Sequence, residues 1–275
     1  RCWQMAELNL EFTEMEIQSF LKRIEVDFSV PNEQSLEEIV SGIIEHLPFQ
    51  NFSMLTDDWV RPSPLKIKRD MLSGHGGLCT VRNPFLHEFL KSLGFSVRYV
   101  SSTINEPDCH ISLLVNIDNN DWWVDVGNGF PYLKPIQLGN QREINHPFIK
   151  YRIVNKQGRW YVQHKKSEGE WKTNHHFSDN GVPYSIFDKM HKLHYSIPGW
   201  GPFLTGLRVN RWWMEGGVIL KDERAFSPDG EEILRTPMEI ISWVKKWFPK
   251  SGFLDSIDVQ NADLIWRKTA SKFGD

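Results

Sequence analysis

The sequence HISLLVNIDNNDWWVDVG, residues 110–127, alternates apolar and polar side chains in two runs. Apolar residues recur at every second position through 111–117 and again through 122–126, which is the period of a β-strand. The residues between the runs, DNND at 118–121, are typical turn formers. A third alternating run, at 95–99, precedes them. We therefore predict an antiparallel sheet whose centre is a hairpin over residues 110–127.

Helical patterns precede this sheet. Thr13 and Glu16 form a capping-box pair, in which each side chain bonds a free amide at a helix start, and an apolar stripe at helical spacing follows. The same pair recurs at Ser35 and Glu38, and Pro48 stops the second stripe. We predict two amphipathic helices that pack against another element.

Mixed elements follow the sheet. The pattern predicts a further hairpin over 151–162, an irregular segment over 177–201 and more strands over 204–220. The sequence TPME at 236–239 supplies an N-cap, a first-turn proline and a box glutamate, so it opens a terminal helix. Helices first, strands second and a mixed segment last indicate the α+β class, with an N-terminal helical bundle and a central antiparallel β-sheet or barrel.

Composition and charge exclude several classes of protein. The chain has 275 residues, of which 40% are hydrophobic and 24% charged, as in ordinary globular domains. Its 32 basic and 35 acidic side chains give a net charge of -3, which provides no broad electrostatic footprint for nucleic acid or an anionic membrane. No apolar run approaches the length of a membrane-spanning helix. We expect neither nucleic acid nor a membrane among the partners.

The cysteine content favours a reducing compartment. The chain has three cysteines, Cys2, Cys79 and Cys109, too few for a disulfide framework. Residues 1–5 carry no apolar targeting core. We therefore expect a cytoplasmic protein with at least one free thiol.

Cys79 is a candidate nucleophile. It follows the glycine-rich sequence GHGGL at 74–78 and precedes an apolar helical pattern over 85–93. A cysteine between such a loop and a helix start lies where free backbone amides and the helix dipole favour a thiolate. The alternative is that Cys79 is simply a small buried apolar residue.

His110 and Asp125 supply the groups that a cysteine nucleophile needs, an imidazole to take its proton and a carboxylate to orient that imidazole. A two-residue turn at Asn119-Asn120 places both side chains on one face but four residues apart, roughly 13 Å along a strand. Contact between them then requires a bulge, a longer turn or strong twist. The alternative is an ordinary half-buried histidine and a carboxylate that caps a strand end.

The order of these motifs resembles the arylamine N-acetyltransferase family. The family pattern is matched by GGLC at 76–79 with Asn83 after it, then by His110, then by WVDVGNG at 123–129. Two further segments resemble the family, LPFQN at 47–51 and the hairpin and helix over 204–248, so that the resemblance covers approximately residues 10–250.

The resemblance implies a cysteine-protease-like core in which Cys79, His110 and Asp125 form a catalytic triad. It implies that the Cys79 thiolate accepts an acetyl group from acetyl-coenzyme A and passes it to an arylamine or arylhydrazine, with ping-pong kinetics. It also implies three domains with a C-terminal α/β lid, at 1–75, 76–176 and 177–275, and a cofactor cleft lined by Gly127, Asn128 and Gly129.

Other functions remain open from the residues alone. A divergent relative could use the triad as an amide synthase or a thiol hydrolase, or could bind a small molecule without catalysis. No metal is expected, because His175-His176 and His191-Lys192-Leu193-His194 lack a third clear ligand.

Several positions depart from the family pattern. A basic residue and a glutamate that pair in the family are His75 and Gln50 here, and an acidic or amide residue two positions after the cysteine is Val81. We predict that His75 and Gln50 stay neighbours and share a neutral hydrogen bond. Pro84 would lie beyond the first turn of a helix begun at Cys79, so we predict a kink there or a helix that starts afresh with Asn83 as its cap.

Overall fold

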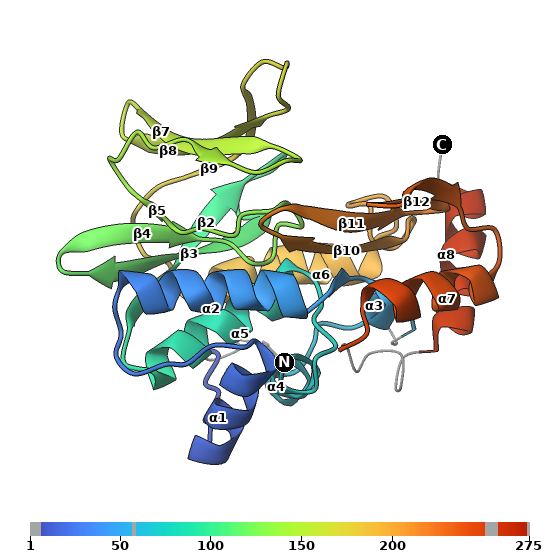
Figure 1. Cartoon of the computed structure of the whole chain (residues 1–275), viewed down its shortest axis with the longest axis horizontal. Coiled ribbons are helices and arrows are strands. Elements are labelled where there is room, and N and C mark those ends of the chain that lie inside the picture. The colour runs from blue at the N-terminus through green and yellow to red at the C-terminus, as the bar shows by residue number, and fades with distance from the viewer. Residues whose placement is uncertain (1–6, 57–58, 251–257, 274–275) are drawn as a thin grey trace.

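Two antiparallel sheets form the framework of the protein (Figure 1). The computed structural model describes residues 7–56, 59–250 and 258–273, so Cys2 and the segment 1–5 lie outside the described residues. The strands are β1 (Phe49–Gln50), β2 (Ser96–Thr103), β3 (His110–Ile117), β4 (Asn120–Val124), β5 (Ile136–Gln137), β6 (Ile144–Asn145), β7 (Lys150–Lys156), β8 (Arg159–Lys165), β9 (Lys172–Phe177), β10 (Arg208–Trp213), β11 (Gly216–Lys221), β12 (Arg224–Ser227) and β13 (Gly230–Ile233). The larger sheet has the order β5-β4-β3-β2-β9-β8-β7-β6, and the smaller has the order β1-β10-β11-β12-β13.

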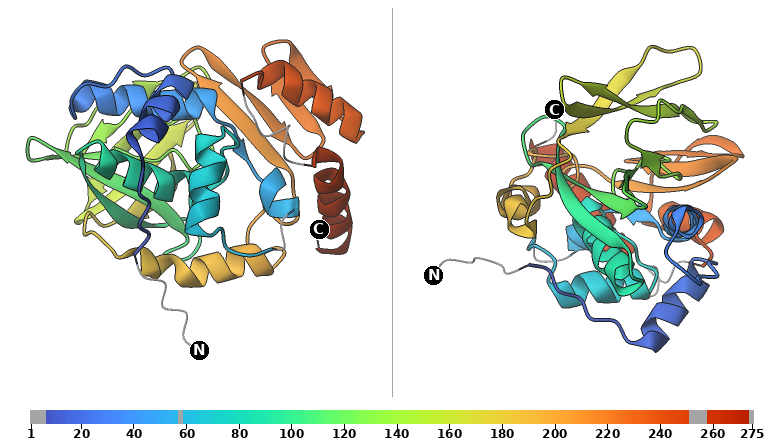
Figure 2. Two further views of the ribbon diagram at one scale, coloured as in Figure 1. Left: turned by 90° about the horizontal axis from the view of Figure 1, so that it is seen from below. Right: turned by 90° about the vertical axis from the view of Figure 1, so that its left-hand side faces the viewer.

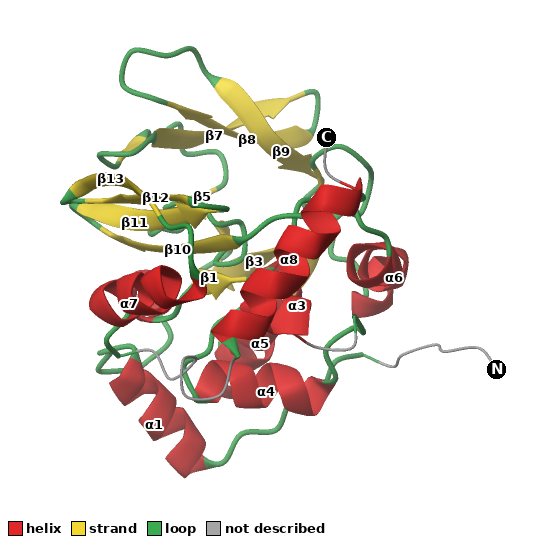
Figure 3. Ribbon diagram, turned by 90° about the vertical axis from the view of Figure 1, so that its right-hand side faces the viewer, coloured by secondary structure: helices red, strands yellow, loops and turns green. Residues whose placement is uncertain are grey.

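Helices cover both sheets, which confirms the α+β class. They are α1 (Glu14–Arg23), α2 (Glu33–His46), α3 (Phe52–Thr56), α4 (Pro64–Leu72), α5 (Cys79–Ser92), a 3-10 helix (Tyr184–Phe187), α6 (Asp188–Ser196), α7 (Pro237–Trp247) and α8 (Val259–Phe273). In Figure 1, α2 and α5 lie beneath β3 and β4, whereas α7 and α8 lie at the other end of the molecule. The left view of Figure 2 shows the two C-terminal helices, in red, beside the orange strands of the smaller sheet, and Figure 3 shows α7 beneath β10 and α8 across α3. Within the described ranges, every helix is too short or too polar to cross a membrane.

The central strand β3 is buried on both faces. Its odd-numbered apolar residues pack against α5, in a cluster that includes Phe85 and Phe89. Leu114, on the opposite face, packs with Trp123 in a second cluster that includes strands β7 and β8. Since His110 begins this strand, its side chain is enclosed by the framework and is not on an open sheet surface.

The central hairpin forms, but its register differs from the prediction. Ile117 pairs with Asn120, so the turn residues are Asp118 and Asn119, whose φ values of 50° and 63° are those of a type I′ turn. The turn therefore lies one residue earlier than the predicted Asn119-Asn120. The observed pair Asp118-Asn119 and the predicted pair Asn119-Asn120 both consist of residues that tolerate a left-handed backbone. A type I′ turn also matches the right-handed twist of the strands.

Helix starts are predicted well, with one shift. The capping boxes of α1 and α7 are present with Thr13 and Thr236 as N-caps. Helix α2 begins three residues earlier than predicted, because Asn32 is the N-cap and Ser35 fills the third helical position of the box. The hairpin predicted around residues 155–158 is formed by β7 and β8.

Two C-terminal predictions are wrong. The segment 177–201 is not irregular throughout, because a 3-10 helix and α6 occupy much of it and bury Phe187 and Met190 against the main core. Helix α7 is not terminal, because α8 follows it and packs with α3 and α7. The division at residues 75 and 176 stays a prediction.

A short strand joins distant parts of the chain. In β1, Phe49 pairs with Asn210 of β10, and the same residue bridges to Gly77 in the loop before α5. Phe52 and Leu55 of α3 are fully buried in the cluster formed by the smaller sheet, α7 and α8. These contacts hold the loop before Cys79 against β1, which is itself joined to the smaller sheet.

Candidate active site

Cys79 is the first residue of α5 and lines a cavity. The backbone of Leu78 is the N-cap, without a side-chain bond to the helix end. The preceding Gly76 and Gly77 have φ values of 67° and 147°, and a Cβ on Gly76 would lie 1.9 Å from the carbonyl oxygen of Pro48. The loop is therefore glycine-rich because it turns tightly against a neighbouring segment. The Cys79 side chain is 8% exposed and borders the cavity.

His110 and Asp125 are in contact. The Nε2 atom of His110 lies 2.6 Å from Oδ2 of Asp125. The observed register allows this contact. Asp125 directly follows β4, and continuing the β3–β4 pairing by one residue places it diagonally across from His110. The remaining ring nitrogen, Nδ1, is not engaged by Asp125, and Cys79 interacts with this imidazole closely enough to raise its pKa.

The charges of this pair support one another. Burial opposes the charged imidazole, but the Asp125 carboxylate and the hydrogen bonds to Asp125 and Cys79 raise the pKa of His110 well above its usual value. Burial likewise opposes the charge of Asp125, yet the His110 imidazolium and its hydrogen bond hold the pKa of that carboxyl below its usual value. Both shifts favour the charged pair, an imidazolium beside a carboxylate.

Asn83 holds the carboxylate in place. Its Nδ2 atom donates to Oδ1 of Asp125 (2.9 Å) and to the carbonyl of Ile111 (2.7 Å), and its Oδ1 accepts from the backbone amide of Val126 (3.0 Å). Asn83 lies one helical turn after Cys79, so nucleophile and carboxylate are linked through one helix face. Helical spacing from Cys79 was the signal in the sequence that could have indicated this role.

Arg82 is a buried cation that the sequence patterns do not predict. It donates through Nε to the carbonyl of Val126 (2.5 Å) and through Nη1 to the carbonyl of Leu47 (2.9 Å). Complete burial lowers the pKa of Arg82 to about 9, and the charge of Asp125 opposes that shift. Arg82 thus joins the end of α2 to the segment that carries Asp125.

His175, on β9, lies beside the Asp125 carboxylate. Its Nε2 atom lies 3.9 Å from Oδ2 of Asp125, and its side chain is fully buried. Burial, assisted by the charge of His110, lowers the pKa of His175 to about 3, so the ring is neutral. Nothing in the sequence periodicity indicates that β9 would lie beside β2 and deliver this histidine.

His110, Asp125 and His175 form one group of side chains close enough to hold a metal, with ligand atoms within 4.8 Å of one another. The separation of His110 Nε2 and Asp125 Oδ2, 2.6 Å, is that of a hydrogen bond. Two ligands on a tetrahedral Zn²⁺ lie about 3.3 Å apart, given bonds of about 2.0–2.2 Å. A metal would therefore have to separate the histidine–carboxylate pair.

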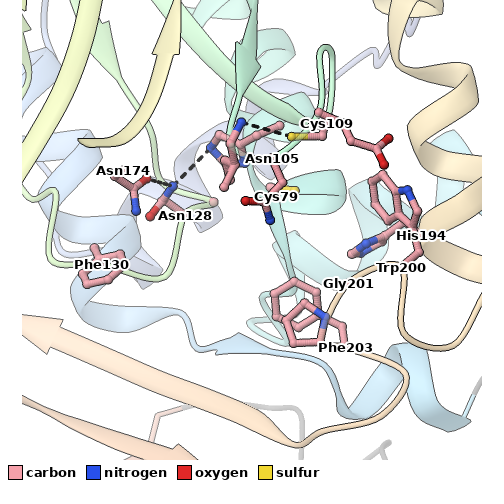
Figure 4. A pocket seen from close by; sticks show the side chains of 15 residues that line it. Cys79, Asn105, Cys109, Asn128, Phe130, Asn174, His194, Trp200, Gly201 and Phe203 are labelled. Atoms are coloured by element: carbon pink, nitrogen blue, oxygen red, sulfur yellow. Dashed lines mark hydrogen bonds between the residues drawn. The ribbon is translucent and has the colours of Figure 1, made fainter. Parts of the chain in front are cut away.

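The cavity beside Cys79 has a volume of about 370 Å³. Figure 4 shows Asn128, Asn174 and Phe130 on one side of Cys79, with His194 and Trp200 on the other. Burial lowers the pKa of His194 to about 4, so that this imidazole is neutral. The full lining is Cys79, Ile104, Asn105, Glu106, Cys109, His110, Gly127, Asn128, Phe130, Asn174, His194, Trp200, Gly201, Pro202 and Phe203.

The structure places the residues that depart from the family pattern, Gln50, His75, Val81 and Pro84. Gln50 and His75 are neighbours, and the amide of Gln50 donates to the backbone carbonyl of His75 (3.1 Å). Pro84 lies inside α5, which runs without interruption from Cys79 to Ser92, so the prediction of a new helix start at Asn83 is wrong. Val81 is buried in the main core.

The chain matches a known protein family and a curated relative in sequence. A family model described as N-acetyltransferase matches residues 33–237. The uncharacterized acetyltransferase YvcN of Bacillus subtilis is 26% identical over 193 residues, which cover 66% of this chain and 74% of that protein.

Solved structures agree with this match. The arylamine N-acetyltransferase of Salmonella typhimurium superposes with a TM-score of 0.80 at 18% identity, over 96% of this chain and 100% of that one. The Mycobacterium marinum arylamine N-acetyltransferase in complex with CoA superposes with a TM-score of 0.78 at 19% identity, over 92% of this chain and 99% of that one.

The fold thus defines an α+β protein with a cysteine-protease-like core, in which a cysteine at a helix start faces a buried histidine–carboxylate pair. By its family match, the chain belongs to the arylamine N-acetyltransferase family, whose members are enzymes.

Proposed function

We propose that this protein transfers an acetyl group from acetyl-coenzyme A to an arylamine or arylhydrazine through a thioester on Cys79. The observation that carries the proposal is the meeting of Cys79, His110 and Asp125 at the edge of a cavity of about 370 Å³. Family membership supports the same reaction.

The geometry supports a two-step transfer. With the proton of Cys79 held on His110, the thiolate attacks the carbonyl carbon of the donor thioester; the coenzyme A thiol then leaves with that proton from His110. In the second step the amine attacks the acetylated cysteine, gives a proton to His110 and releases the Cys79 thiolate. The backbone amide of Cys79, at the first residue of α5, is suited to stabilise the oxyanion in both steps.

The loop Gly127–Gly129 is the proposed place for the acyl donor. Asn128 lines the cavity, and Trp212 donates from Nε1 to the carbonyl of Gly129 (2.8 Å), which anchors the loop to the smaller sheet. A Cβ on Gly129 would lie 3.2 Å from the ring of Phe49, so the loop passes close to β1. The CoA complex of the Mycobacterium marinum enzyme makes acetyl-coenzyme A the donor to test first. No metal takes part in the proposed reaction, and the cytoplasm stays the proposed compartment.

Mass spectrometry after mixing with acetyl-coenzyme A tests the proposal. We expect one acetyl group on Cys79, absent from Cys79→Ala and retained in Cys109→Ala, which removes the other cysteine of the cavity. Prompt iodoacetamide labelling of Cys79 without acetylation would instead indicate a different acyl donor, as in an amide synthase or thiol hydrolase. No acetyl adduct together with slow labelling would indicate a binding protein.

The charge of the cavity predicts a preference among acceptors. Among the residues that the structure describes, Glu106 is the acidic side chain of the lining, and neither lysine nor arginine belongs to it. We therefore expect kcat/KM to be lower for 4-aminobenzoate than for the uncharged 4-aminobenzamide. Glu106 is exposed, so that solvent screens its field. Glu106→Gln should therefore reduce the ratio of kcat/KM for 4-aminobenzamide to kcat/KM for 4-aminobenzoate by about two- to fivefold. Glu168→Gln, on an exposed turn outside the cavity, is the control, and an unchanged ratio in Glu106→Gln would contradict the prediction.

A further inference from the structure

A chain of polar side chains runs from the proposed donor loop to the carboxylate. Asn128 contacts Asn174 (Nδ2 to Oδ1, 2.9 Å), and Asn174 Oδ1 lies 2.7 Å from Nδ1 of His175. The other ring nitrogen of His175 faces Asp125 at 3.9 Å. Figure 4 shows the pairing of Asn128 with Asn174 at the cavity wall. Because Asn174 and His175 belong to β9, a separate strand is joined to the back of the histidine–carboxylate pair.

The tautomer of His175 decides whether a lone pair or an N–H group faces the Asp125 carboxylate. A neutral imidazole has one N–H donor and one acceptor nitrogen. If the proton is on Nδ1, the lone pair of Nε2 points at a carboxylate, and Nε2 has no hydrogen-bond partner among the described residues. If the proton is on Nε2, an N–H dipole points at the carboxylate. The second arrangement is electrostatically favourable in a buried site.

The second arrangement requires that Asn174 present its amide nitrogen to Nδ1 of His175. An amide fills the same space in either orientation, so its partners decide which is adopted. A contact at Asn128 favours the reversed orientation as well. His110 Nε2 donates to Asp125, and Nδ2 of Asn128 lies 3.5 Å from that same nitrogen, which would set two donors face to face. With both amides reversed, an amide oxygen of Asn128 accepts from Asn174 and faces His110.

We propose that His175 is a positioning residue for the catalytic carboxylate, whose Nε2–H tautomer, set by Asn174 and Asn128, points an N–H at Asp125. This proposal rests on the proposed function. His175 is not among the described residues that line the cavity; it acts through Asp125, which in turn orients His110. The donor loop and the carboxylate are thereby coupled through two side chains.

Nitrogen NMR of the histidine side chains tests the tautomer directly and needs no enzymatic activity. The signals of His175 are identified by their loss in His175→Gln. We expect the wild-type protein to carry the proton on Nε2, and Asn174→Asp to move it to Nδ1, because a carboxylate can only accept from that nitrogen. A wild-type ring with its proton on Nδ1 would overturn the proposal.

Iodoacetamide labelling of Cys79 tests the effect on the nucleophile. His175→Leu, which has no N–H, should slow labelling about five- to tenfold, and His175→Gln, whose amide can donate, should stay within about twofold of the wild type. His176→Leu, at the next position on β9, is the matched control. If His175→Leu and His175→Gln slow the labelling of Cys79 equally, His175 has a packing role only and the proposal is overturned. Since labelling needs no acetyl donor, a failed acetyl transfer leaves this test intact.

Discussion

Replacing Asp125 with asparagine is expected to slow acetylation of Cys79 about 10³- to 10⁴-fold while the fold survives. The Oδ1 position of residue 125 accepts from Asn83 and from the amide of Gly127 (3.0 Å), so the amide oxygen of the variant would take that place. Its amide nitrogen would then face Nε2 of His110 and force this atom to accept. The proton of a neutral His110 would lie on Nδ1, facing Cys79, where it cannot take up the thiol proton.

The pH dependence of iodoacetamide labelling checks this mechanism. The raised pKa of His110 keeps the imidazolium charged through neutral pH, so labelling of wild-type Cys79 should change little across that range. In Asp125→Asn, burial would dominate and lower the pKa of His110, the imidazolium would be lost at acidic pH, and labelling should rise with pH as for an ordinary thiol. Asp121→Asn, on the same hairpin, is the control, since Asp121 pairs with Arg98. An acetylation rate within tenfold of the wild type would refute the assigned role of Asp125.

Gly127→Ala is expected to reduce acetylation at least 100-fold and to lower the free energy of unfolding by about 2–4 kcal/mol. A Cβ at this position would lie 2.5 Å from Cα of Cys79 and 2.7 Å from Nδ2 of Asn83. The first contact is with backbone, which cannot swing away, so α5 and the loop after Asp125 would have to separate. The start of the helix and the carboxylate would then lose their relative positions.

Thermal unfolding and Cys79 labelling measure the two effects of this substitution separately. Gly169→Ala is the matched control, because its added Cβ meets nothing closer than 3.5 Å. A normal melting temperature with normal labelling in Gly127→Ala would show that the close approach of the two segments is not required.

Local patterns in the sequence predict much of the framework. The capping boxes at Thr13 and Thr236 and the hairpin over 151–162 depend on neighbouring residues, and all three appear as expected. The register of the central hairpin was harder, because Asp118, Asn119 and Asn120 all suit a left-handed turn. One residue of difference in the turn moved Asp125 two positions closer to its partner.

The rest of the site depends on long-range packing that periodicity does not encode. His175 reaches Asp125 because β9 pairs with β2, two strands that are far apart in the sequence. Arg82 resembles a surface residue in a helix until α2 and the loop after Asp125 enclose it. The aromatic wall formed by Trp200 and Phe203 is delivered by the segment after α6.

The two-residue strand β1 has a consequence for how the chain folds. Phe49 and Gln50 form the outer edge of a sheet whose other members are made more than 150 residues later. Phe52 and Leu55 are likewise covered only once the last third of the polypeptide has been synthesised and has collapsed onto them. The nucleophile loop, tied to Phe49, therefore cannot acquire its final shape until β10 and the strands and helices that follow it have been synthesised.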